Sequence, residues 1–305
     1  MRPKIAIVLV TYNSAAVLEG CLQSLPDGAR GVTLTDIVVA DNASTDESVR
    51  IATESTMQVQ SVQLERNAGY AAGFNAGLAV LDLGRLDAVL LLNPDCRLRP
   101  GCLAILAAAL REPGRGITAP RLLNPDGSLQ PTLRRMPTVG RALAEAMIGG
   151  ERAGRIGTLG ELVFDPVEHE RAGPAAWVTG AAMLISTRCL AEVGPWDESF
   201  LLYSEETEFI LRAADAGWST WYEPEAEVEH IGGECATDPA LAALLVVNKV
   251  RLFRRRRSQP AATAYYLVVL LGQAVRALAG GPTARAAVAA LLRPSRRPHS
   301  LAELG

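Results

Sequence analysis

One stretch limits the fold of this chain more than any other: five apolar residues, Ala88 to Leu92, that end abruptly at Asn93-Pro94-Asp95. Such a run is too short for a helix and fits a strand buried on both faces. Proline cannot donate to a sheet ladder, so the strand ends before Pro94. Asp95 then lies at the carboxyl end of a central parallel strand, where ligands bind in open α/β sheets. A carboxylate there suits a divalent cation that bridges diphosphate oxygens, and a plain turn-capping role is the alternative.

Short apolar runs alternate with helical patterns in the N-terminal part of the chain. The runs are 5–10, 37–40 and 59–64, and helices are predicted over 15–25 and from about residue 47. This β-α-β-α order predicts a doubly wound, mostly parallel sheet with right-handed crossovers. A chain of 305 residues is long enough for one large α/β domain or two small ones.

Polar residues follow three of the predicted strands, at Thr11–Asn13, Asp41–Asp46 and Asn93–Asp95. The carboxyl ends of parallel strands meet at one edge of a sheet, so these residues are expected to lie together. The first group can pack against a base or ribose, and Asp41 can accept a hydrogen bond from a base imide. Turn and helix-capping roles are the alternative, which fits Asp46 better than Asp41.

Glycine recurs every fourth residue at Gly69, Gly73 and Gly77, so on a helix the three share one face. Small residues on one face permit close approach to a sheet or a ligand. Arg66, just before them, can reach a diphosphate. The segment is not the GxGxxG dinucleotide fingerprint, which argues against a dehydrogenase. Tight helix packing alone is the alternative explanation for most of these glycines.

The middle of the chain carries weaker signals. A turn signal at 124–128 predicts a hairpin between short strands. Residues 149–173 are rich in Gly, Arg and Glu, and we expect a mobile loop there, a candidate lid over the site. Residues 177–185 have strand character around Gly180, which indicates a bulge or a close approach to a ligand.

Five carboxylates occur in an apolar setting before and within a predicted helix. Part of this cluster has a structural explanation, because Ser204 can cap the helix and acidic residues are favoured in a first helical turn. That explanation does not cover all five, and one of them is the candidate general base. The five are Asp197, Glu198, Glu205, Glu206 and Glu208.

Histidine is rare, with three in the chain. A strand is predicted at 218–222, and His230 follows it in a Gly-rich turn. There His230 can be a metal ligand or a diphosphate donor, and a purely structural role is the alternative.

Charge is unevenly distributed, although the net charge of −3 gives no indication of a nucleic-acid partner. Residues 192–238 carry thirteen acidic side chains and one basic one, whereas residues 249–300 carry eleven basic ones and no acid. The first region suits a site that handles a cation, and the second suits a basic surface.

The pattern is helical beyond residue 240. An apolar run at 261–275 follows a basic stretch at 248–257, and we expect it to be too short to span a bilayer. Basic residues beside an apolar helix suit docking on an anionic membrane surface. Packing on the catalytic domain or on the partner in a homodimer is the alternative. The tail, residues 293–305, is expected to be disordered.

The five cysteines are scattered and form no CxxC pair, which is typical of reduced thiols in a cytosolic protein. Residues 1–4 lead directly into a strand, with no signal-like apolar region. We therefore expect a cytoplasmic protein at the inner face of the plasma membrane.

Together these motifs resemble those of the family 2 glycosyltransferases, and more narrowly the bacterial rhamnosyltransferase-like branch that acts on lipid-linked glycans. The match extends from about Lys4 to His230. No single motif is specific, but their order and spacing are. The motifs are Val10-Thr11-Tyr12-Asn13, Asp41-Asn42-x-Ser44-x-Asp46, Arg66-Asn67-x-Gly69-Tyr70-x-x-Gly73-x-Asn75-x-Gly77, Asn93-Pro94-Asp95, and Phe200 to Arg212.

The resemblance implies a GT-A fold, which is α/β with a Rossmann-like, mostly parallel central sheet, followed here by a C-terminal helical extension. Residues 1–237 would form the catalytic domain, with a nucleotide-sugar half at about 1–120 and an acceptor half at about 121–237. Residues 238–292 would form the helical region, and 293–305 the tail.

The resemblance also implies roles for single residues. Asn93-Pro94-Asp95 matches the family's DxD motif, so Asp95 and His230 are the expected ligands of Mg²⁺ or Mn²⁺. Glu206 is the expected base by position, with Glu205 as the alternative because the family often has Glu-Asp here. The expected nucleotide-sugar contacts are Thr11, Tyr12, Asn13, Asp41, Asn42, Arg66, Asn67, Gly73, Asn75, Asn93 and Asp95. The expected acceptor or donor-sugar region includes Trp177, Gly180, Ala181, Asp197 and Tyr203.

These roles predict an inverting hexosyltransferase that moves a sugar from a nucleotide-diphospho-sugar to a hydroxyl of a glycan or polyprenyl-linked acceptor in cell-envelope polysaccharide synthesis. The resemblance favours dTDP-L-rhamnose as donor, and a UDP- or GDP-sugar with another acceptor, such as a secondary metabolite, stays open. A nucleotidyltransferase would usually have a Gly-rich, basic loop after its first strand, which is absent. A catalytically inactive sugar-nucleotide-binding protein is disfavoured by the intact Asp95, Glu206 and His230.

Overall fold

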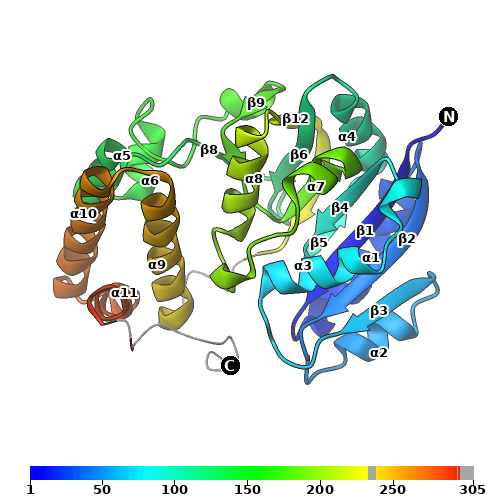
Figure 1. Ribbon diagram of the computed structural model, residues 1–305, viewed down its shortest axis with the longest axis horizontal. Helices are drawn as coiled ribbons and strands as arrows, with labels where there is room; N and C mark the ends of the chain where they lie inside the picture. The colour runs from blue at the N-terminus through cyan, green and yellow to red at the C-terminus, as the bar shows by residue number, and fades with distance from the viewer. Residues whose placement is uncertain (233–237, 294, 296–305) are drawn as a thin grey trace.

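The computed structural model describes residues 1–232, 238–293 and 295. It has two parts, a twisted sheet with helices on both faces and a group of helices beside it (Figure 1). The α/β architecture predicted for the N-terminal part is confirmed, and so is the helical character of the C-terminal region.

Within the described residues, ten strands form one main sheet and two form a small one. The main sheet contains β1 (Lys4–Thr11), β2 (Thr33–Asp41), β3 (Val59–Gln63), β4 (Ala88–Leu92), β5 (Cys96–Leu98), β6 (Arg115–Leu123), β7 (Leu129–Gln130), β9 (Gly173–Ala175), β11 (Ala182–Ser186) and β12 (Ser219–His230), and the small sheet contains β8 (Leu133–Arg134) and β10 (Trp177–Val178). The order β3-β2-β1-β4 is parallel throughout. Beyond β4 the order β11-β6-β12-β5 includes antiparallel pairs, so the sheet is mixed there rather than mostly parallel.

Both faces of the sheet are buried, which explains why its central strands are continuously apolar. In β1, Ile5 and Ile7 pack against one layer of helices, whereas Ala6 and Val8 pack against the other, because side chains alternate along a strand. The first layer contains α1 (Ala15–Gly28), α2 (Ser48–Thr53) and α4 (Cys102–Leu110), and the second contains α3 (Tyr70–Ala79), α7 (Thr187–Val193) and α8 (Glu205–Asp215). Three short 3₁₀ helices complete this part: η1 (Leu83–Arg85), η2 (Glu168–Glu170) and η3 (Glu198–Phe200).

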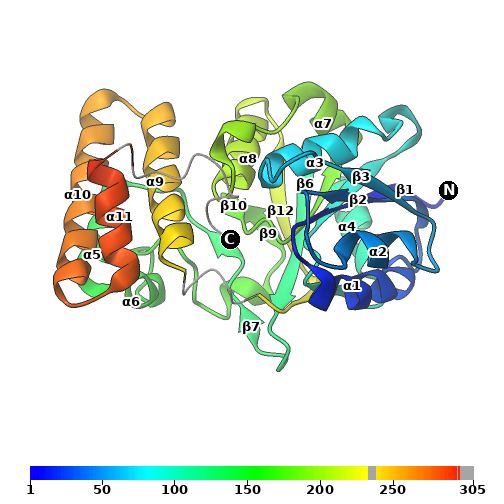
Figure 2. The same cartoon turned by 90° about the horizontal axis from the view of Figure 1, so that it is seen from below.

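The second part combines helices from the middle and the end of the chain. They are α5 (Val139–Ile148), α6 (Gly150–Arg155), α9 (Pro239–Arg256), α10 (Gln259–Leu278) and α11 (Pro282–Leu292). Figures 1 and 2 both place α9 on the side of the group that faces the sheet and α10 on the far side. The rings of Phe253 and Tyr265 stack at 3.9 Å between α9 and α10. Lys249 of α9 forms ion pairs with Glu161 at 2.7 Å and Glu145 at 3.2 Å, which tie the middle segment to the C-terminal helices.

Three segments differ from their predicted structure. Residues 149–173, expected to be a mobile loop, contain α6, η2 and the start of β9. Residues 177–185 are not one strand, because strand structure is interrupted around Gly180. The residues before it belong to the small sheet, and those from Ala182 belong to the main sheet. The strand predicted at 218–222 continues through a register shift, so His230 ends β12 instead of lying in a turn.

The expectation that the apolar run at 261–275 is too short to span a bilayer was wrong. The helix that contains it, α10, has 20 residues and is long and apolar enough to cross a membrane by length and composition. One such helix among the described residues is weak support for a span. Only 17% of its apolar window is buried, however, so α10 is not a core helix.

The described cysteines are free and buried, as expected for reduced thiols. Cys235 lies outside the described residues, and so does the predicted tail apart from residues 293 and 295.

Candidate active site

The carboxyl ends of β1 and β2 meet around Asp41. Its Oδ1 accepts hydrogen bonds from the hydroxyls of Thr11 (2.7 Å) and Ser44 (2.6 Å), and its Oδ2 accepts one from the Ser44 backbone N–H (2.8 Å). Thr11 is fully buried and Asp41 is 1% exposed. Thr11 therefore orients the Asp41 carboxylate, which retains lone pairs on Oδ2 for another donor.

Two predicted nucleotide-sugar contacts are occupied with backbone groups of the loop before α3. The Asn42 side chain donates to the Gly69 carbonyl oxygen (3.3 Å), and the Asn67 side chain accepts from the Gly69 N–H (3.2 Å). Both asparagines are buried. They hold the loop that carries Arg66 against the end of β2.

Two further predicted contacts pack α3 in place. A Cβ atom at Gly73 would lie 2.5 Å from the Val10 side chain, so glycine lets α3 press onto β1. The Asn75 amide exchanges hydrogen bonds with the backbone of Trp196 at 2.9 and 3.0 Å. Gly73 and Asn75 are thus engaged in packing within the protein.

The side chains of Tyr12, Asn13 and Arg66 are exposed at this edge of the sheet. Asn13 has a left-handed backbone with φ of 47°, and its side-chain oxygen accepts a hydrogen bond from the Thr45 N–H (2.9 Å). Among the described residues, the Arg66 guanidinium has no hydrogen bond or ion pair. These three side chains are the ones best placed to meet a ligand from solvent.

Asp95 and His230 come together because β5, which begins directly after Asp95, pairs with the end of β12. Asp95 Oδ2 lies 3.3 Å from His230 Nε2 and accepts a hydrogen bond from the Gly232 N–H (3.1 Å). Burial alone would raise the pKa of Asp95, but the hydrogen bonds from His230 and Gly232 and the His230 charge hold it below its ordinary value. The carboxylate is therefore ionised at neutral pH.

This pair fits a divalent cation. Asp95 Oδ1 is buried and has no hydrogen-bond partner, so one oxygen is left for a ligand. Asp95, His230 and Cys96 offer ligand atoms within 4.8 Å of one another. Burial raises the pKa of the Cys96 thiol well above its usual range, and the thiol lies 3.5 Å from the Ala181 carbonyl oxygen. Cys96 therefore stays protonated, and an oxygen and a nitrogen remain as ligands.

Tyr70, at the start of α3, lies near both this pair and the glutamates of α8. Its hydroxyl donates to Asn93 Oδ1 at 2.5 Å. Burial raises the pKa of Tyr70, and the negative charges of Glu205, Asp95 and Glu206 raise it further. The phenol is therefore a neutral hydrogen-bond donor, and the charges of both acidic groups act on it.

The turn before α8 has an unusual backbone. Leu201, Tyr203 and Ser204 have positive φ angles of 61°, 68° and 75°. The prediction that the Ser204 side chain caps α8 was wrong, because its left-handed backbone carries no side-chain capping bond. The Asn248 amide of α9 donates to the carbonyl oxygens of Phe200 (2.7 Å) and Leu202 (2.9 Å), which holds the turn in place. Such strain persists only where the surroundings enforce it.

Glu205 and Glu206 are two adjacent carboxyl groups at the start of α8. Glu205 is 2% exposed, and its Oε2 is buried without a hydrogen-bond partner. Burial raises the pKa of Glu205 well above its ordinary value, and the charge of Glu206 adds to this effect. Burial also raises the pKa of Glu206, but backbone hydrogen bonds and the Arg134 charge oppose the rise. Glu206 is therefore the member of the pair that ionises more readily.

The other three carboxylates of the cluster have partners. Asp197 accepts from the Ser199 N–H (2.9 Å) and pairs with Arg255 (2.5 Å). Glu208 pairs with Arg212 at 2.8 Å. Glu198 accepts from the amide of Asn75 (2.9 Å). The structure thus leaves Glu205 and Glu206 as the candidates for proton transfer, and it engages Asp197 in an ion pair.

The segment between β10 and β11 connects the two acidic groups. A Cβ atom at Gly180 would lie 3.1 Å from the Cβ and Cγ atoms of Glu206. The carbonyl oxygen of the next residue, Ala181, accepts from the Asn93 N–H at 2.8 Å. The predicted close approach at Gly180 is therefore to the protein's own glutamate. Gly180 contacts Glu206, and its neighbour Ala181 contacts Asn93, so this segment links Glu206 to the Asn93–Asp95 loop.

Arg134 is a site residue that sequence reasoning missed. Its guanidinium donates to the Thr179 hydroxyl (3.1 Å) and lies 5.6 Å from the Trp177 ring, and its Nε is buried without a partner. Burial lowers the pKa of Arg134, but the group remains a cation beside Glu206. Arg134 belongs to the two-residue strand β8, which has no periodic sequence signal.

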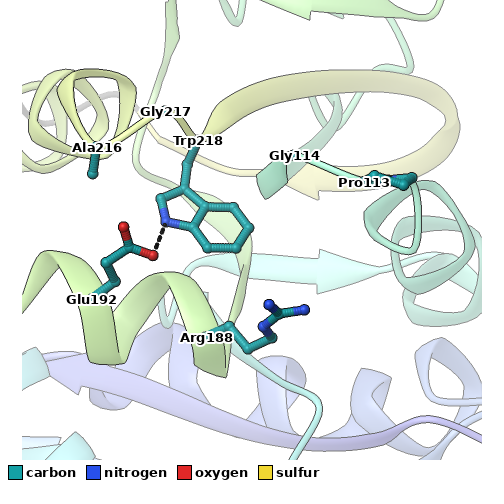
Figure 3. A pocket seen from close by; sticks show the side chains of 7 residues that line it. All are labelled: Pro113, Gly114, Arg188, Glu192, Ala216, Gly217 and Trp218. Carbon is teal, nitrogen blue, oxygen red and sulfur yellow. Dashed lines mark hydrogen bonds between the residues drawn. The ribbon is translucent and has the colours of Figure 1, made fainter.

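A hollow of about 310 Å³ lies elsewhere, at the opposite ends of β6 and β12 from His230 (Figure 3). The Trp218 indole donates to Glu192 at 3.1 Å across it, and the Arg188 side chain lines it. It shares no residue with the site around Asp95.

The sequence and fold have relatives among known proteins. Residues 6–171 match the model of glycosyl transferase family 2. The N-acetylglucosaminyl-diphospho-decaprenol L-rhamnosyltransferase of Mycobacterium tuberculosis is 31% identical over 252 residues, 79% of this chain and 80% of that protein. The low-salt glycan biosynthesis hexosyltransferase Agl10 of Haloferax volcanii is 28% identical over 214 residues, 70% of this chain and 62% of that protein.

Solved structures share the fold at low sequence identity. The mannosyltransferase PcManGT from Pyrobaculum calidifontis, in complex with GDP-Man and Mn²⁺, has a TM-score of 0.59 and 16% identity, with 95% of this chain and 79% of that chain covered. The glucosyl-3-phosphoglycerate synthase from Mycobacterium tuberculosis has a TM-score of 0.54 and 16% identity, with 82% and 80% covered. The sequence match and the shared fold lead to one conclusion: the chain belongs to glycosyl transferase family 2 and has the GT-A fold.

Proposed function

We propose that this enzyme is an inverting, metal-dependent hexosyltransferase that uses a nucleotide-diphospho-sugar to extend a lipid-linked glycan in cell-envelope polysaccharide synthesis. One observation carries the proposal. Gly180 lies against Glu206, and the next residue, Ala181, accepts a hydrogen bond from Asn93, so Glu206 and the loop that carries Asp95 contact the same short segment of the chain. The Asp95–His230 pair suits a cation, and the Glu205–Glu206 pair suits a general base.

Asp95 and His230 would hold Mg²⁺ or Mn²⁺, which when bound neutralises the leaving diphosphate. Asp41 would accept a hydrogen bond from the base, with Thr11 keeping its carboxylate in place. The exposed Tyr12 and Asn13 would cover the base or ribose, and Arg66 would reach the diphosphate. Neighbours of the same fold are bound to Mn²⁺, which supports the metal proposal.

Glu206 would take the proton from an acceptor hydroxyl. The oxygen then attacks the anomeric carbon from the side opposite the diphosphate, the bond from that carbon to the diphosphate oxygen breaks, and the configuration inverts. Burial favours this role because it makes Glu206 a stronger base than an exposed glutamate. The charge of Arg134 keeps Glu206 ionised enough to accept a proton, whereas Glu205 stays protonated.

The donor sugar is proposed from the relative. The mycobacterial protein is named an L-rhamnosyltransferase, which favours dTDP-L-rhamnose here and a polyprenyl-diphosphate-linked sugar as acceptor. UDP- and GDP-sugars are the alternatives. Donor hydrolysis and transfer assays with dTDP-rhamnose, UDP-GlcNAc and GDP-mannose, each with Mn²⁺ and with EDTA, test both claims. We expect turnover with dTDP-rhamnose that EDTA abolishes. Turnover that persists in EDTA would refute the metal dependence. Turnover with another donor but not with dTDP-rhamnose would refute the proposed donor sugar.

A peripheral membrane partner is part of the proposal. The outward face of α10 exposes Leu267 (55%), Leu271 (61%) and Val275 (55%), and Met147 of α5 is 75% exposed. The two helices cross closely where a Cβ atom at Gly272 would lie 2.8 Å from Ala146. Leu267, Leu271 and Val275 recur every fourth residue, so they share one exposed face of α10, its outer surface.

Charge favours a bilayer over a second copy of this chain as the cover of that surface. Residues 239–293 carry nine basic side chains and no acid, and three of these, Lys249, Arg255 and Arg256, form ion pairs with carboxylates elsewhere in the chain. The helical region therefore keeps a positive charge that would repel a second copy and attract anionic lipids. We therefore propose that α10 lies on an anionic membrane, where a polyprenyl-linked acceptor is found. Sedimentation with phosphatidylglycerol vesicles tests this proposal. Binding is expected, and a stable dimer without vesicle binding would favour the homodimer instead.

A further inference from the structure

His230 has a second partner that no site prediction included. Its Nδ1 lies 2.5 Å from Oε1 of Gln130, the last residue of β7, while its Nε2 lies 3.3 Å from Asp95 Oδ2. Both ring nitrogens are therefore engaged, each by an oxygen. The two oxygens compete for the single proton of the neutral ring, and the Gln130 oxygen approaches its nitrogen more closely than the Asp95 oxygen does.

The orientation of Gln130 is set by a chain of hydrogen bonds through the hairpin between β6 and β7. The chain begins at the Asp126 carboxylate, which can only accept, so the Ser128 hydroxyl donates to it (2.6 Å). The Ser128 oxygen accepts from the Asn124 NH₂ group (2.9 Å), which leaves the Asn124 oxygen facing Gln130. Gln130 must then donate its NH₂ group to Asn124 (3.1 Å) and turn its oxygen to His230.

The consequence is a preference for one tautomer. Because the Gln130 oxygen at 2.5 Å is closer than the Asp95 oxygen at 3.3 Å, the geometry favours the proton of the neutral ring on Nδ1, which leaves the lone pair on Nε2. That lone pair faces Asp95 Oδ2, which is also an acceptor. Two lone pairs at this separation repel each other unless a proton on Nε2, as in the charged ring, or a metal cation lies between them. The geometry is thus prepared for a metal ligand at Nε2.

We propose that Gln130, oriented by the hydrogen-bond chain that begins at Asp126, is a positioning residue that keeps His230 in the Nδ1–H tautomer and presents its Nε2 lone pair to the metal. The inference rests on the metal role proposed for His230. Outer partners of ligating histidines orient the ring in this way, and their loss typically weakens metal binding by about 10- to 100-fold.

The tautomer can be measured in the metal-free, full-length protein. Long-range ¹H–¹⁵N correlation spectra distinguish a protonated ring nitrogen from one with a lone pair, and a His230→Gln sample assigns the signal. At a pH where the ring is neutral, wild type is expected to show Nδ1–H. Gln130→Leu removes the acceptor, and we expect Nε2–H, donated to Asp95. Gln130→Glu retains an acceptor and is expected to retain Nδ1–H.

Metal affinity is the second measurement, with Mn²⁺ alone titrated and free Mn²⁺ followed by electron paramagnetic resonance. Gln130→Leu should weaken Mn²⁺ binding by about 10- to 100-fold. In transfer assays it should raise the KM for Mn²⁺ more than it lowers kcat at saturating metal. Gln130→Glu should bind at least as tightly as wild type. Gln60→Leu, on the exposed face of the edge strand β3, is the matched control and should change nothing.

The outcomes separate the two levels of the proposal. An Nε2–H tautomer in wild type overturns the role of Gln130 even if Mn²⁺ binds, and the metal site would stand without it. An Nδ1–H tautomer in a protein that binds no Mn²⁺ overturns the metal role itself, and the inference falls with it. If Gln130→Leu does not fold, the wild-type tautomer and the Gln130→Glu affinity still decide the case.

Discussion

The sheet edge around Asp95 and the outer surface of α10 depart from ordinary burial in opposite directions. At the sheet edge, polar atoms are buried without partners, namely Asp95 Oδ1 and Glu205 Oε2. On α10, large apolar side chains such as Leu271 are exposed to water. Folded proteins normally satisfy buried polar groups and cover large apolar patches. Both regions are therefore incomplete in the isolated chain, one towards a charged ligand and the other towards an apolar surface.

The largest effect is expected at the base. Glu206→Gln keeps the shape and removes the proton acceptor, so transfer should fall by roughly 10²- to 10⁴-fold while donor binding is retained. Single-turnover transfer rates and donor affinity measured on the same preparation check this expectation.

Glu205→Gln is the matched control, because it changes the adjacent, protonated carboxyl group. It should retain most of the transfer activity. Near-native turnover of Glu206→Gln together with loss of activity in Glu205→Gln would exchange the two roles.

The pH profile is expected to depend on Arg134. The Arg134 charge opposes the rise of the Glu206 pKa that burial causes, so Arg134→Gln should raise that pKa further. The acidic limb of kcat/KM, which reports the free enzyme's base, should then move to higher pH. Arg135→Gln, one residue away, tests whether the shift is specific. An unchanged limb in Arg134→Gln would remove Arg134 from the site.

Glu205 is expected to reduce stability at neutral pH. Its pKa is higher in the folded than in the unfolded chain, so its contribution is most favourable below the unfolded value and is lost as pH rises towards the folded one. Glu205→Gln should therefore unfold at higher denaturant concentration at pH 8, by on the order of 1 kcal/mol or more. The gain should shrink at pH 4. A gain that is independent of pH would show that ionisation is not its cause.

The smallest effect on catalysis is expected from the outer surface. Leu267→Glu combined with Leu271→Glu places charges on exposed positions, so the fold should persist while binding to phosphatidylglycerol vesicles weakens by about tenfold or more. Transfer to a water-soluble acceptor should be unchanged, and transfer to a bilayer-embedded acceptor should fall. Equal loss with both acceptors would mean that α10 supports the fold instead of a membrane contact.

The sequence predicted the parts of this molecule that depend on local pattern. The run from Ala88 to Leu92 is continuously apolar because both faces of β4 are covered, and Pro94 ends it as expected. Asp41 ends β2 and Asp95 follows β4, as the polar residues after each apolar run predicted.

The parts that were missed depend on contacts distant in sequence. Asp95 and His230 were expected together from the family resemblance, but the strand pairing that joins them was missed, because β12 runs past its predicted end and pairs with β5. Arg134 and Gln130 lie on two-residue strands, too short to show any periodicity. Ser204 was expected to cap a helix, but the turn before it is held by Asn248 from α9, and no local pattern reveals that support.

A crystal of the protein soaked with Mn²⁺ and a nucleoside diphosphate would test the central claim most directly. We predict one anomalous difference peak within bonding distance of Asp95 and of His230 Nε2, with the diphosphate on the side that faces Tyr70. A peak that lies outside bonding distance of both residues, or an ordered nucleotide far from Asp41 and Asp95, would contradict the account.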